Sequence, residues 1–222
     1  GRLCMFNLSV LVTDKFVQAV KDDDDWDLNF EGAIFKSIRA RELWDKIMRS
    51  TYTFAEPGVI FIDRINKLNN LGYCESIHGT NPCGEQPLPP YGACLLGSIN
   101  LAKFVIKPFT DNASILLENL AACTATAVRL MDNVIDTSQF PLIQQEHEAK
   151  SKRRIGLGIT GLADALIMCN VRYGSPAAVK LTETWLKCIQ RSAYLSSADL
   201  AREKGAFPLF DADQYLTNGH AS

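Results

Sequence analysis

The chain has 222 residues, of which 47% are hydrophobic, so it is long enough to bury one large core or two small ones. Its 23 basic and 25 acidic side chains give a net charge of −2, which excludes a general electrostatic attraction for nucleic acid or for an anionic membrane surface. No apolar run reaches the roughly 18 residues that a membrane-spanning helix requires. We therefore expect a soluble globular chain with neither nucleic acid nor membrane as a partner.

Seven cysteines, an odd number, favour a reducing cytosolic setting in which a functional cysteine pair is catalytic rather than structural. No signal peptide is expected. The chain begins with Gly1-Arg2-Leu3, which is not an initiator sequence, so we expect a piece of a longer protein. The cysteines are Cys4, Cys74, Cys83, Cys94, Cys123, Cys169 and Cys188.

The first predicted elements are a strand and a short helix. Alternating apolar residues over 8–12 predict a largely buried strand, and Thr13 begins a helix that carries Phe16, Val17 and Val20. The charged stretch over 22–37 fits a hairpin.

A second helix and strand follow. Helical spacing of apolar residues over 40–55 predicts a helix, which Glu56-Pro57-Gly58 ends. The apolar, β-branched residues 59–62 predict a buried strand, and Asp63 follows it.

The remaining elements continue the alternation of strands and helices. We expect strands over 93–101 and 153–159. We expect helices over 114–136, after Pro141, over 162–169, and from Ser175-Pro176 to Gly205. The predicted core stripe of the first of these helices is Leu116, Leu120, Cys123, Ala127, Leu130 and Val134, and that of the last is Leu181, Trp185, Cys188, Ser192 and Leu195. This pattern predicts an α/β fold with parallel strands.

The composition of the stretch from Thr80 to Leu101 is typical of a reactive loop rather than of a helix or strand. It places two cysteines, a carboxylate, an amide, four prolines and three glycines in 22 positions. If residues 81–85 are extended, then Asn81, Cys83 and Glu85 point to one edge, each roughly 7 Å from the next. A thiol beside a carboxylate and an amide, with no histidine placed for a protease-like pair, suits hydrogen-atom abstraction assisted by a base.

Two weaker motifs give alternatives. Residues 156–161 match the G-x-G-x-x-G dinucleotide motif, but the required second strand with an acidic end falls inside a predicted helix, so glycines that ease close packing are the preferred interpretation. Cys74, His78, Cys83 and Cys94 could surround zinc in a structural module, although their spacings lack a C-x-x-C pair. A structural disulfide between Cys83 and Cys94 is also conceivable.

The sequence around this stretch resembles the catalytic subunit of ribonucleotide reductase, and is closest to the adenosylcobalamin-dependent class II. The central motif is Asn81-Pro82-Cys83-Gly84-Glu85-Gln86-Pro87-Leu88-Pro89, followed by Gly92-Ala93-Cys94-Leu95-Leu96-Gly97-Ser98-Ile99-Asn100-Leu101. Further matches are Phe6–Val10 with Val12–Asp14, Glu56–Asp63, and Lys152–Gly158 with Gly161–Asp164. The resemblance covers nearly the whole chain.

The resemblance implies a radical reduction of ribonucleotides to 2′-deoxyribonucleotides for DNA synthesis. Cys83 would become the thiyl radical that takes the 3′ hydrogen atom, Glu85 would accept the 3′-hydroxyl proton, and Asn81 would hold the ribose hydroxyl. Cys94 matches the redox cysteine that closes a disulfide as the 2′-hydroxyl leaves as water. Its partner cysteine is not assigned, because Cys4 does not match the family's pattern.

The resemblance also implies a fold and partners. Residues 1–222 would be part of a ten-stranded α/β barrel, with a finger loop over about 80–92. The expected cofactor is adenosylcobalamin, with no metal ligands in this chain, and the expected reductant is an external thiol protein such as thioredoxin. Full-length family members imply a homodimer and allosteric nucleotide effectors. Because the family's first redox cysteine, phosphate-binding segment and allosteric sites are not matched by these residues, we expect this chain alone to be inactive. The alternative is a class I large subunit that receives its radical from a partner metal subunit.

Overall fold

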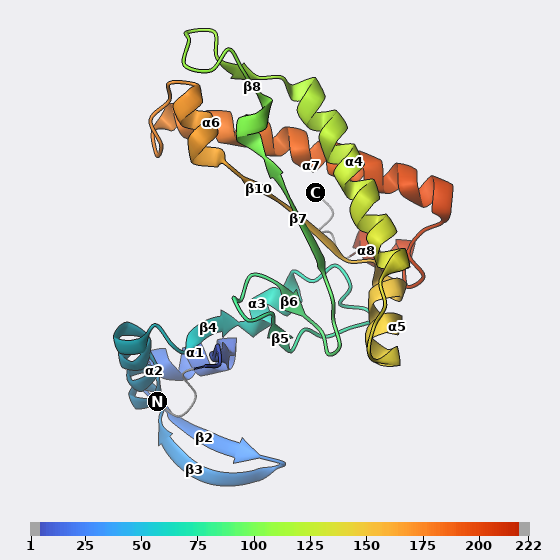
Figure 1. Ribbon diagram of the computed structural model, residues 1–222. Helices are drawn as coiled ribbons and strands as arrows, with labels where there is room; N and C mark the ends of the chain where they lie inside the picture. The colour runs from blue at the N-terminus through green and yellow to red at the C-terminus, as the bar shows by residue number, and fades with distance from the viewer. Residues whose placement is uncertain (1–4, 218–222) are drawn as a thin grey trace. The chain divides into compact units, whose positions relative to one another are not determined.

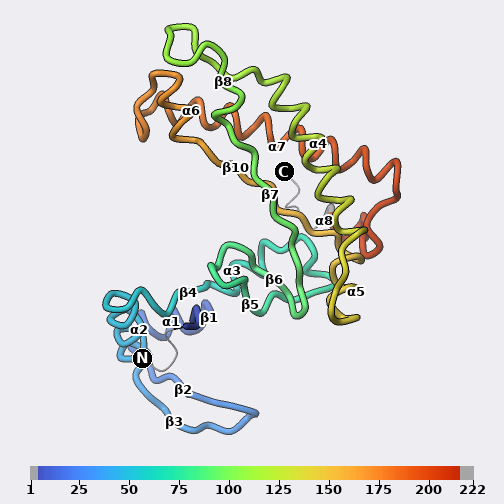
Figure 2. Tube along the Cα trace, viewed as in Figure 1, coloured from blue at the N-terminus to red at the C-terminus, as the bar shows by residue number. Residues whose placement is uncertain are grey.

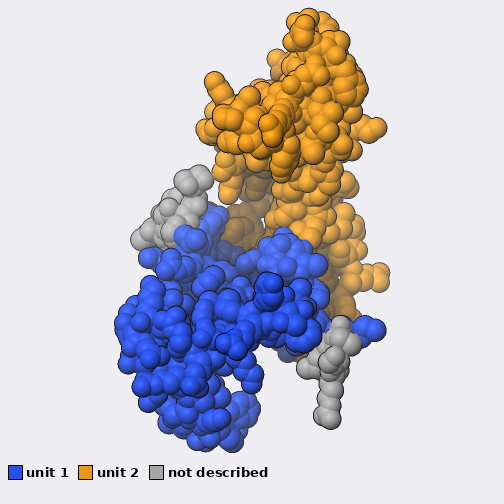
Figure 3. Space-filling model, turned by 90° about the vertical axis from the view of Figure 1, so that its left-hand side faces the viewer, with its two compact units in different colours: residues 1–91, 211–222 blue, residues 92–210 orange. Residues whose placement is uncertain are grey.

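The computed structural model describes residues 5–217, so Cys4 lies outside the described residues. The chain forms two compact units, residues 1–91 with 211–222 and residues 92–210 (Figure 3). The trace in Figure 2 shows that the chain completes most of the first unit, builds the second, and then contributes its last described helix to the first.

The first unit is built on two parallel strands, β1 (Ser9–Val12) and β4 (Gly58–Phe61), paired from Ser9 with Gly58 to Val12 with Phe61. Helix α1 (Asp14–Asp22) follows β1 directly, and its first turn is capped because the Thr13 Oγ1 accepts the Phe16 N–H at 3.1 Å. Helix α2 (Ala40–Phe54) packs beside α1. The core of this unit contains Val12, Phe16, Ala19, Val20 and Ala40.

The expected hairpin is present between these helices. Strands β2 (Asp25–Phe30) and β3 (Ala33–Arg39) pair antiparallel, as the charged stretch predicted. Figure 1 shows this hairpin as a long two-stranded arm. Its base joins the core, because Trp26 packs edge-on against Phe16 with ring centroids 5.0 Å apart.

The strands of this unit are less buried than the sequence predicted. Val12 is buried, but Leu11 and Phe61 keep 41% and 45% of their surface exposed. Strand β4 ends at Phe61, because helix α3 (Ile62–Lys67) begins one residue before Asp63. The unit is completed by the short strands β5 (Gly79–Thr80) and β6 (Pro87–Leu88) and by helix α8 (Ala212–Thr217).

The second unit is built on the parallel pair β7 (Leu95–Asn100) and β10 (Ile155–Thr160), in register from Leu95 with Ile155 to Asn100 with Thr160. Two long helices, α4 (Leu117–Thr137) and α7 (Pro176–Lys204), pack along each other beside these strands (Figure 1). Met131 of α4 lies so close to Gly97 that a Cβ there would stand 3.0 Å from its sulfur. The core comprises Ile99, Leu101, Ile115, Leu120, Ala165, Leu166, Ala178, Trp185 and Ile189.

Shorter elements connect this framework. After β7 come a 3₁₀ turn, η1 (Leu101–Phe104), and the antiparallel strands β8 (Val105–Ile106) and β9 (Ser114–Ile115). Helix α5 (Ile143–Lys152) precedes β10, and α6 (Leu162–Met168) follows it. Helix α7 begins as predicted, with the Ser175 Oγ accepting the Ala178 N–H at 3.1 Å and proline at its first position, and Gly205 follows its last residue.

The predicted core stripes of the two long helices were largely wrong. The buried residues of α4 are Leu120, Thr124, Val128, Met131 and Ile135, whereas Leu130 is 62% exposed and Cys123 is exposed. On α7, Trp185 is buried as predicted, but the stripe continues through Ile189 and Leu200 while Leu195 is exposed. Both helices carry apolar residues on more than one face, so spacing alone selected a neighbouring stripe.

The α/β class with parallel strands is confirmed, whereas the described residues do not show the expected barrel. The described residues form five two-stranded sheets, two parallel and three antiparallel, and they contain no closed barrel. None of the described helices combines the length and apolar character needed to cross a membrane.

Gly161 explains part of the glycine motif at residues 156–161. It has φ +69°, precedes α6, and lies against the end of β7, where an added Cβ would clash with the Asn100 Oδ1. That oxygen already accepts the Ala102 N–H at 3.1 Å. This glycine therefore permits a close approach of two chain segments, as the packing interpretation predicts.

We expect Gly161→Ala to lower the free energy of unfolding by about 1–3 kcal/mol, because it combines backbone strain with a steric clash. Gly174→Ala is the matched control, since Gly174 also has a positive φ, +76°, but no atom lies within 4 Å of the added Cβ. Urea unfolding measures both. Equal losses would show that the contact with Asn100 contributes nothing.

Candidate active site

Cys83 lies in the loop of the hairpin formed by β5 and β6. Gly79 pairs with Leu88 and Thr80 with Pro87, so the chain reverses over residues 81–86. Asn81 closes this loop through three hydrogen bonds. Its N–H donates to the Gln86 C=O at 3.1 Å, its Oδ1 accepts the Gln86 N–H at 2.9 Å, and its C=O accepts the Gly84 N–H at 3.1 Å.

The expectation that residues 81–85 are extended was wrong. The bond from the Gly84 N–H to the Asn81 C=O makes a turn with Pro82 and Cys83 at its centre. Proline favours the first central position of such a turn because its ring fixes φ, and Gly84 leaves the turn with φ +86°. The three site residues therefore share one short loop, not one edge of an extended segment.

The loop exposes two of its three candidate side chains to solvent. The side chains of Cys83 and Glu85 are exposed and that of Asn81 is half-buried. Because the Asn81 Oδ1 already accepts the Gln86 N–H, the side-chain group that Asn81 offers is its NH₂ donor. The loop thus offers an exposed free thiol, a carboxylate and an amide donor within five residues.

Cys94 is placed by the second unit. It immediately precedes β7, and the next residue, Leu95, donates its N–H to the Arg154 C=O at 3.2 Å. Burial raises the pKa of the Cys94 thiol, while the positive charge of Arg154 acts in the opposite direction. Cys94 is therefore a half-buried thiol held at the start of a paired strand.

The two thiols do not form the structural disulfide considered from the sequence. Cys83 belongs to the first unit and Cys94 to the second, and both are free thiols in this structure. Within residues 5–217 no group of three or more His, Cys, Asp or Glu side chains is arranged to hold a metal ion. The zinc alternative on Cys74, His78, Cys83 and Cys94 therefore has no ligand cluster in the part of the chain that the structure describes.

An ion-pair network fixes the start of β10, which pairs with the strand that follows Cys94. Arg153, in a left-handed conformation with φ 49°, ends α5 and donates to Asp132 at 2.8 Å and to Asp136 at 2.6 Å. Lys204, the last residue of α7, donates to the same two carboxylates at 2.6 and 3.1 Å. No signal in the sequence indicated this network, because the residues that pair with each other are 17 to 72 positions apart.

This network lowers the pKa of both carboxyl groups. Hydrogen bonds from Arg153 and then Lys204 hold the pKa of Asp136 at about 2. For Asp132, burial acts to raise the pKa, but the hydrogen bonds from Arg153 and Lys204 outweigh it and the pKa is lowered.

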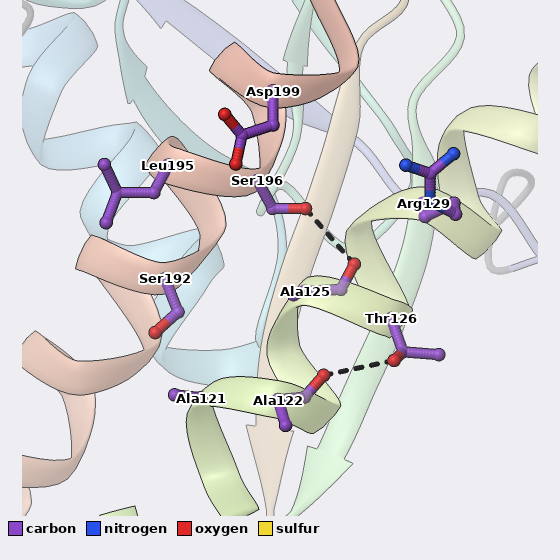
Figure 4. A pocket seen from close by; sticks show the side chains of 9 residues that line it. All are labelled: Ala121, Ala122, Ala125, Thr126, Arg129, Ser192, Leu195, Ser196 and Asp199. Carbon is purple, nitrogen blue, oxygen red and sulfur yellow. Dashed lines mark hydrogen bonds between the residues drawn. The ribbon is translucent and has the colours of Figure 1, made fainter. Parts of the chain in front are cut away.

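A groove in the second unit lies between α4 and α7 and contains none of the predicted site residues. Figure 4 shows the small side chains that line it and two side-chain hydrogen bonds, from the Ser196 Oγ to the Ala125 C=O at 3.2 Å and from the Thr126 Oγ1 to the Ala122 C=O at 3.1 Å. The lining is Ala121, Ala122, Ala125, Thr126, Arg129, Ser192, Leu195, Ser196 and Asp199.

Comparison with known proteins gives a consistent similarity. The family described as "Ribonucleotide reductase, barrel domain" matches residues 1–221. The chain is 40% identical over 219 residues, 98% of its length, to a vitamin B12-dependent ribonucleoside-diphosphate reductase of Thermoplasma acidophilum, of which it covers 28%. It is 39% identical over 216 residues, 96% of its length, to a protein of the same name from Mycobacterium tuberculosis, of which it covers 30%.

A more distant relative carries a different name. The chain is 28% identical over 186 residues, 82% of its length, to a ribonucleoside-diphosphate reductase subunit alpha of Chlamydia pneumoniae, of which it covers 17%. The chain therefore spans less than a third of the length of these curated relatives.

The Arg153 network predicts an acid-sensitive stability. Because the folded pKa of Asp136 lies below its ordinary value of 3.8, its contribution is complete above about pH 4 and is lost as the pH falls towards 2. We expect Arg153→Met to lower stability at pH 7 by about 1 kcal/mol, a value discounted for solvent screening, and to flatten this acid dependence.

The control is Arg202→Met, which removes an exposed ion pair to Asp199 at the same end of α7. Urea unfolding between pH 2 and pH 7 checks both variants. If the Arg153→Met variant lost as much stability as the parent protein when the pH falls from 7 to 2, the acid dependence would not come from this network.

Proposed function

Because the chain belongs to the ribonucleotide reductase barrel-domain family, we propose that it carries the radical-bearing part of a site that reduces ribonucleotides to 2′-deoxyribonucleotides for DNA synthesis. The observation that carries the proposal is the loop closed by Asn81, which exposes the Cys83 thiol between an amide donor and the Glu85 carboxylate. We further propose that both units belong to one catalytic barrel domain, in which residues 80–92 are the finger loop.

Cys83 is the proposed site of the radical. Loss of a hydrogen atom from its S–H group leaves a thiyl radical, which then takes the 3′ hydrogen atom of the ribose and re-forms the S–H bond. An exposed thiol that is free of any disulfide suits this exchange. The position of Cys83 at the centre of a turn lets a substrate approach it without displacing a neighbouring strand.

Glu85 and Asn81 act on the ribose hydroxyl groups in this proposal. Glu85 accepts the proton of the 3′-hydroxyl as general base, a role worth roughly 10²- to 10⁴-fold in rate. The Asn81 NH₂ group donates a hydrogen bond to a ribose hydroxyl oxygen, since its Oδ1 is engaged by Gln86. One residue thus closes the loop and holds the substrate.

Cys94 supplies reducing equivalents in this proposal. As the 2′-hydroxyl leaves as water, two thiols lose their hydrogen atoms and form a disulfide, which delivers the two electrons of the reduction. Cys94 is one of them, and its partner is not assigned to a residue of this chain. An external thiol reductant such as thioredoxin then restores both thiols.

The cofactor we propose is adenosylcobalamin. The relatives of Thermoplasma acidophilum and Mycobacterium tuberculosis, which are named vitamin B12-dependent, are 39–40% identical to the chain, whereas the Chlamydia pneumoniae relative named subunit alpha is 28% identical. When bound, this cofactor supplies the radical that takes the hydrogen atom from Cys83. The free, exposed Cys83 thiol fits such a radical source.

The proposed substrate follows from the names of the same relatives. These relatives are named ribonucleoside-diphosphate reductases, and we propose ribonucleoside diphosphates as the substrate class. A cytosolic homodimer with allosteric nucleotide effectors is the proposed form of the complete protein. Dependence of turnover on added adenosylcobalamin tests the class, because dependence on a second, metal-containing subunit would assign the chain to class I instead.

We expect Cys83→Ser to abolish ribonucleotide reduction in the complete protein, because an O–H bond is too strong to give up its hydrogen atom in place of the thiol. Substrate binding, measured by calorimetry, should be unchanged. Cys123→Ser is the control, since Cys123 is an exposed thiol outside the proposed site. Retained turnover in Cys83→Ser would remove Cys83 from the radical role.

Asn81→Asp separates the two roles of Asn81. An aspartate oxygen still accepts the Gln86 N–H, so the loop stays closed, but the amide donor is lost. We expect kcat/KM to fall roughly 10- to 100-fold, because an unsatisfied polar group costs about 1–3 kcal/mol. Asn81→Ala should also increase hydrogen exchange at Gln86. Normal kinetics in Asn81→Asp would show that the substrate does not use this donor.

A further inference from the structure

The side chain of Asn66 joins helix α3 to the segment that leads into the Cys83 hairpin. Its Oδ1 accepts the Ile77 N–H at 2.8 Å, and its Nδ2 donates to the Ile77 C=O at 3.0 Å. One amide therefore bonds both backbone groups of one residue, which is the pattern that a neighbouring strand would provide. We call this pair of bonds the Asn66 clamp.

The orientation of this amide is fixed by a third bond. The Nδ2 also donates to the Ile62 C=O at 3.2 Å, in the first turn of the same helix. Both carbonyl oxygens require a donor, and the Ile77 N–H requires an acceptor. A flipped amide would break all three bonds, so the clamp has a single arrangement.

The clamp acts on the hairpin at its base. Ile77 is 7% exposed, so its backbone groups need partners inside the protein. The next residue, His78, donates its N–H to the Leu88 C=O at 3.4 Å, and Gly79 then pairs with Leu88. Among the described residues β5 and β6 pair only with each other, so no third strand fixes this hairpin.

Helix α3 is a firm attachment point for this clamp. It follows β4 without a connecting loop, and β4 is paired with β1 along its whole length. The residues between α3 and Ile77 form turns rather than regular structure. Asn66 therefore links the base of the hairpin to the helix that directly continues a paired strand of the first unit.

We propose that Asn66 is a positioning residue for the reaction, which sets the place of the Cys83 thiol by clamping Ile77 to helix α3. The inference rests on the proposed function, since it assigns Cys83 the hydrogen-atom transfer. Asn66 itself need not touch the substrate. A shift of about 1 Å in a reacting group can cost roughly 10²-fold in rate, so loss of the clamp should act on catalysis more than on binding.

The test uses Asn66→Ala in the complete protein. We expect kcat to fall roughly 10²-fold with KM within about twofold of the parent value. Hydrogen exchange measured by mass spectrometry should increase in residues 77–88 and stay unchanged in α1 and α2. Asn66→Asp keeps an acceptor for the Ile77 N–H but removes the donor, so it should fold normally and still lose kcat.

Asn69→Ala is the matched control. Its amide oxygen accepts the Leu71 N–H at 3.1 Å and its NH₂ group donates to the Glu75 carboxylate at 3.0 Å, so both bonds lie in the turns that follow α3. We expect its kcat to stay near the parent value. An equal loss in Asn69→Ala would overturn the proposal, because the effect would then be a general loosening of this segment.

Three other outcomes would also overturn it: unchanged kcat in Asn66→Ala, a rise in KM alone, or unfolding of both Asn66 variants by circular dichroism. Failure of the proposed function gives a different result. In that case Cys83→Ser keeps its turnover, while the increase in hydrogen exchange at residues 77–88 still reports whether the clamp exists.

Discussion

Buried backbone N–H and C=O groups must be hydrogen-bonded, and in this protein asparagine side chains meet that need where short strands cannot. All five sheets of the described residues have only two strands, so many strand edges lack a neighbouring backbone. Asn66 bonds both groups of Ile77, Asn81 closes the loop of Cys83, and Asn100 caps the turn after β7. The candidate site therefore depends on amide side chains more than on sheet structure.

In the second unit, ion pairs rather than amide side chains hold the elements near the candidate site in place. Arg153 and Lys204 share the carboxylates of Asp132 and Asp136, so that α4, α7 and the end of α5 are tied together. Strand β10 begins two residues later and pairs with β7 from Leu95, the residue after Cys94. The proposed redox thiol is thus placed by a strand whose partner is anchored through ion pairs that are partly shielded from water.

The order of the helices and strands could be predicted from the sequence, but the buried face of the long helices could not. Capping residues such as Thr13 and Ser175 and the glycine after α7 mark the ends of helices through local chemistry, which is why those boundaries were predicted closely. The buried face of α4 depends on what packs against it, and Met131 is buried because Gly97 leaves room for it. The site residues could be named from their motif, whereas the turn at Pro82 and the clamp at Asn66 required three-dimensional contacts.

The Asn66 clamp also bears on how this region can vary in length. The clamp joins residues 66 and 77, which are 11 positions apart, so both ends of the turns between them are held in place. Insertions or deletions between these two residues can therefore change the turns without moving the hairpin. The number of residues from 78 to 88 cannot change in this way, because these residues either pair in the hairpin or form the loop that Asn81 closes. Natural length variation should therefore collect between the two clamped residues, which makes this segment the natural place to insert a label.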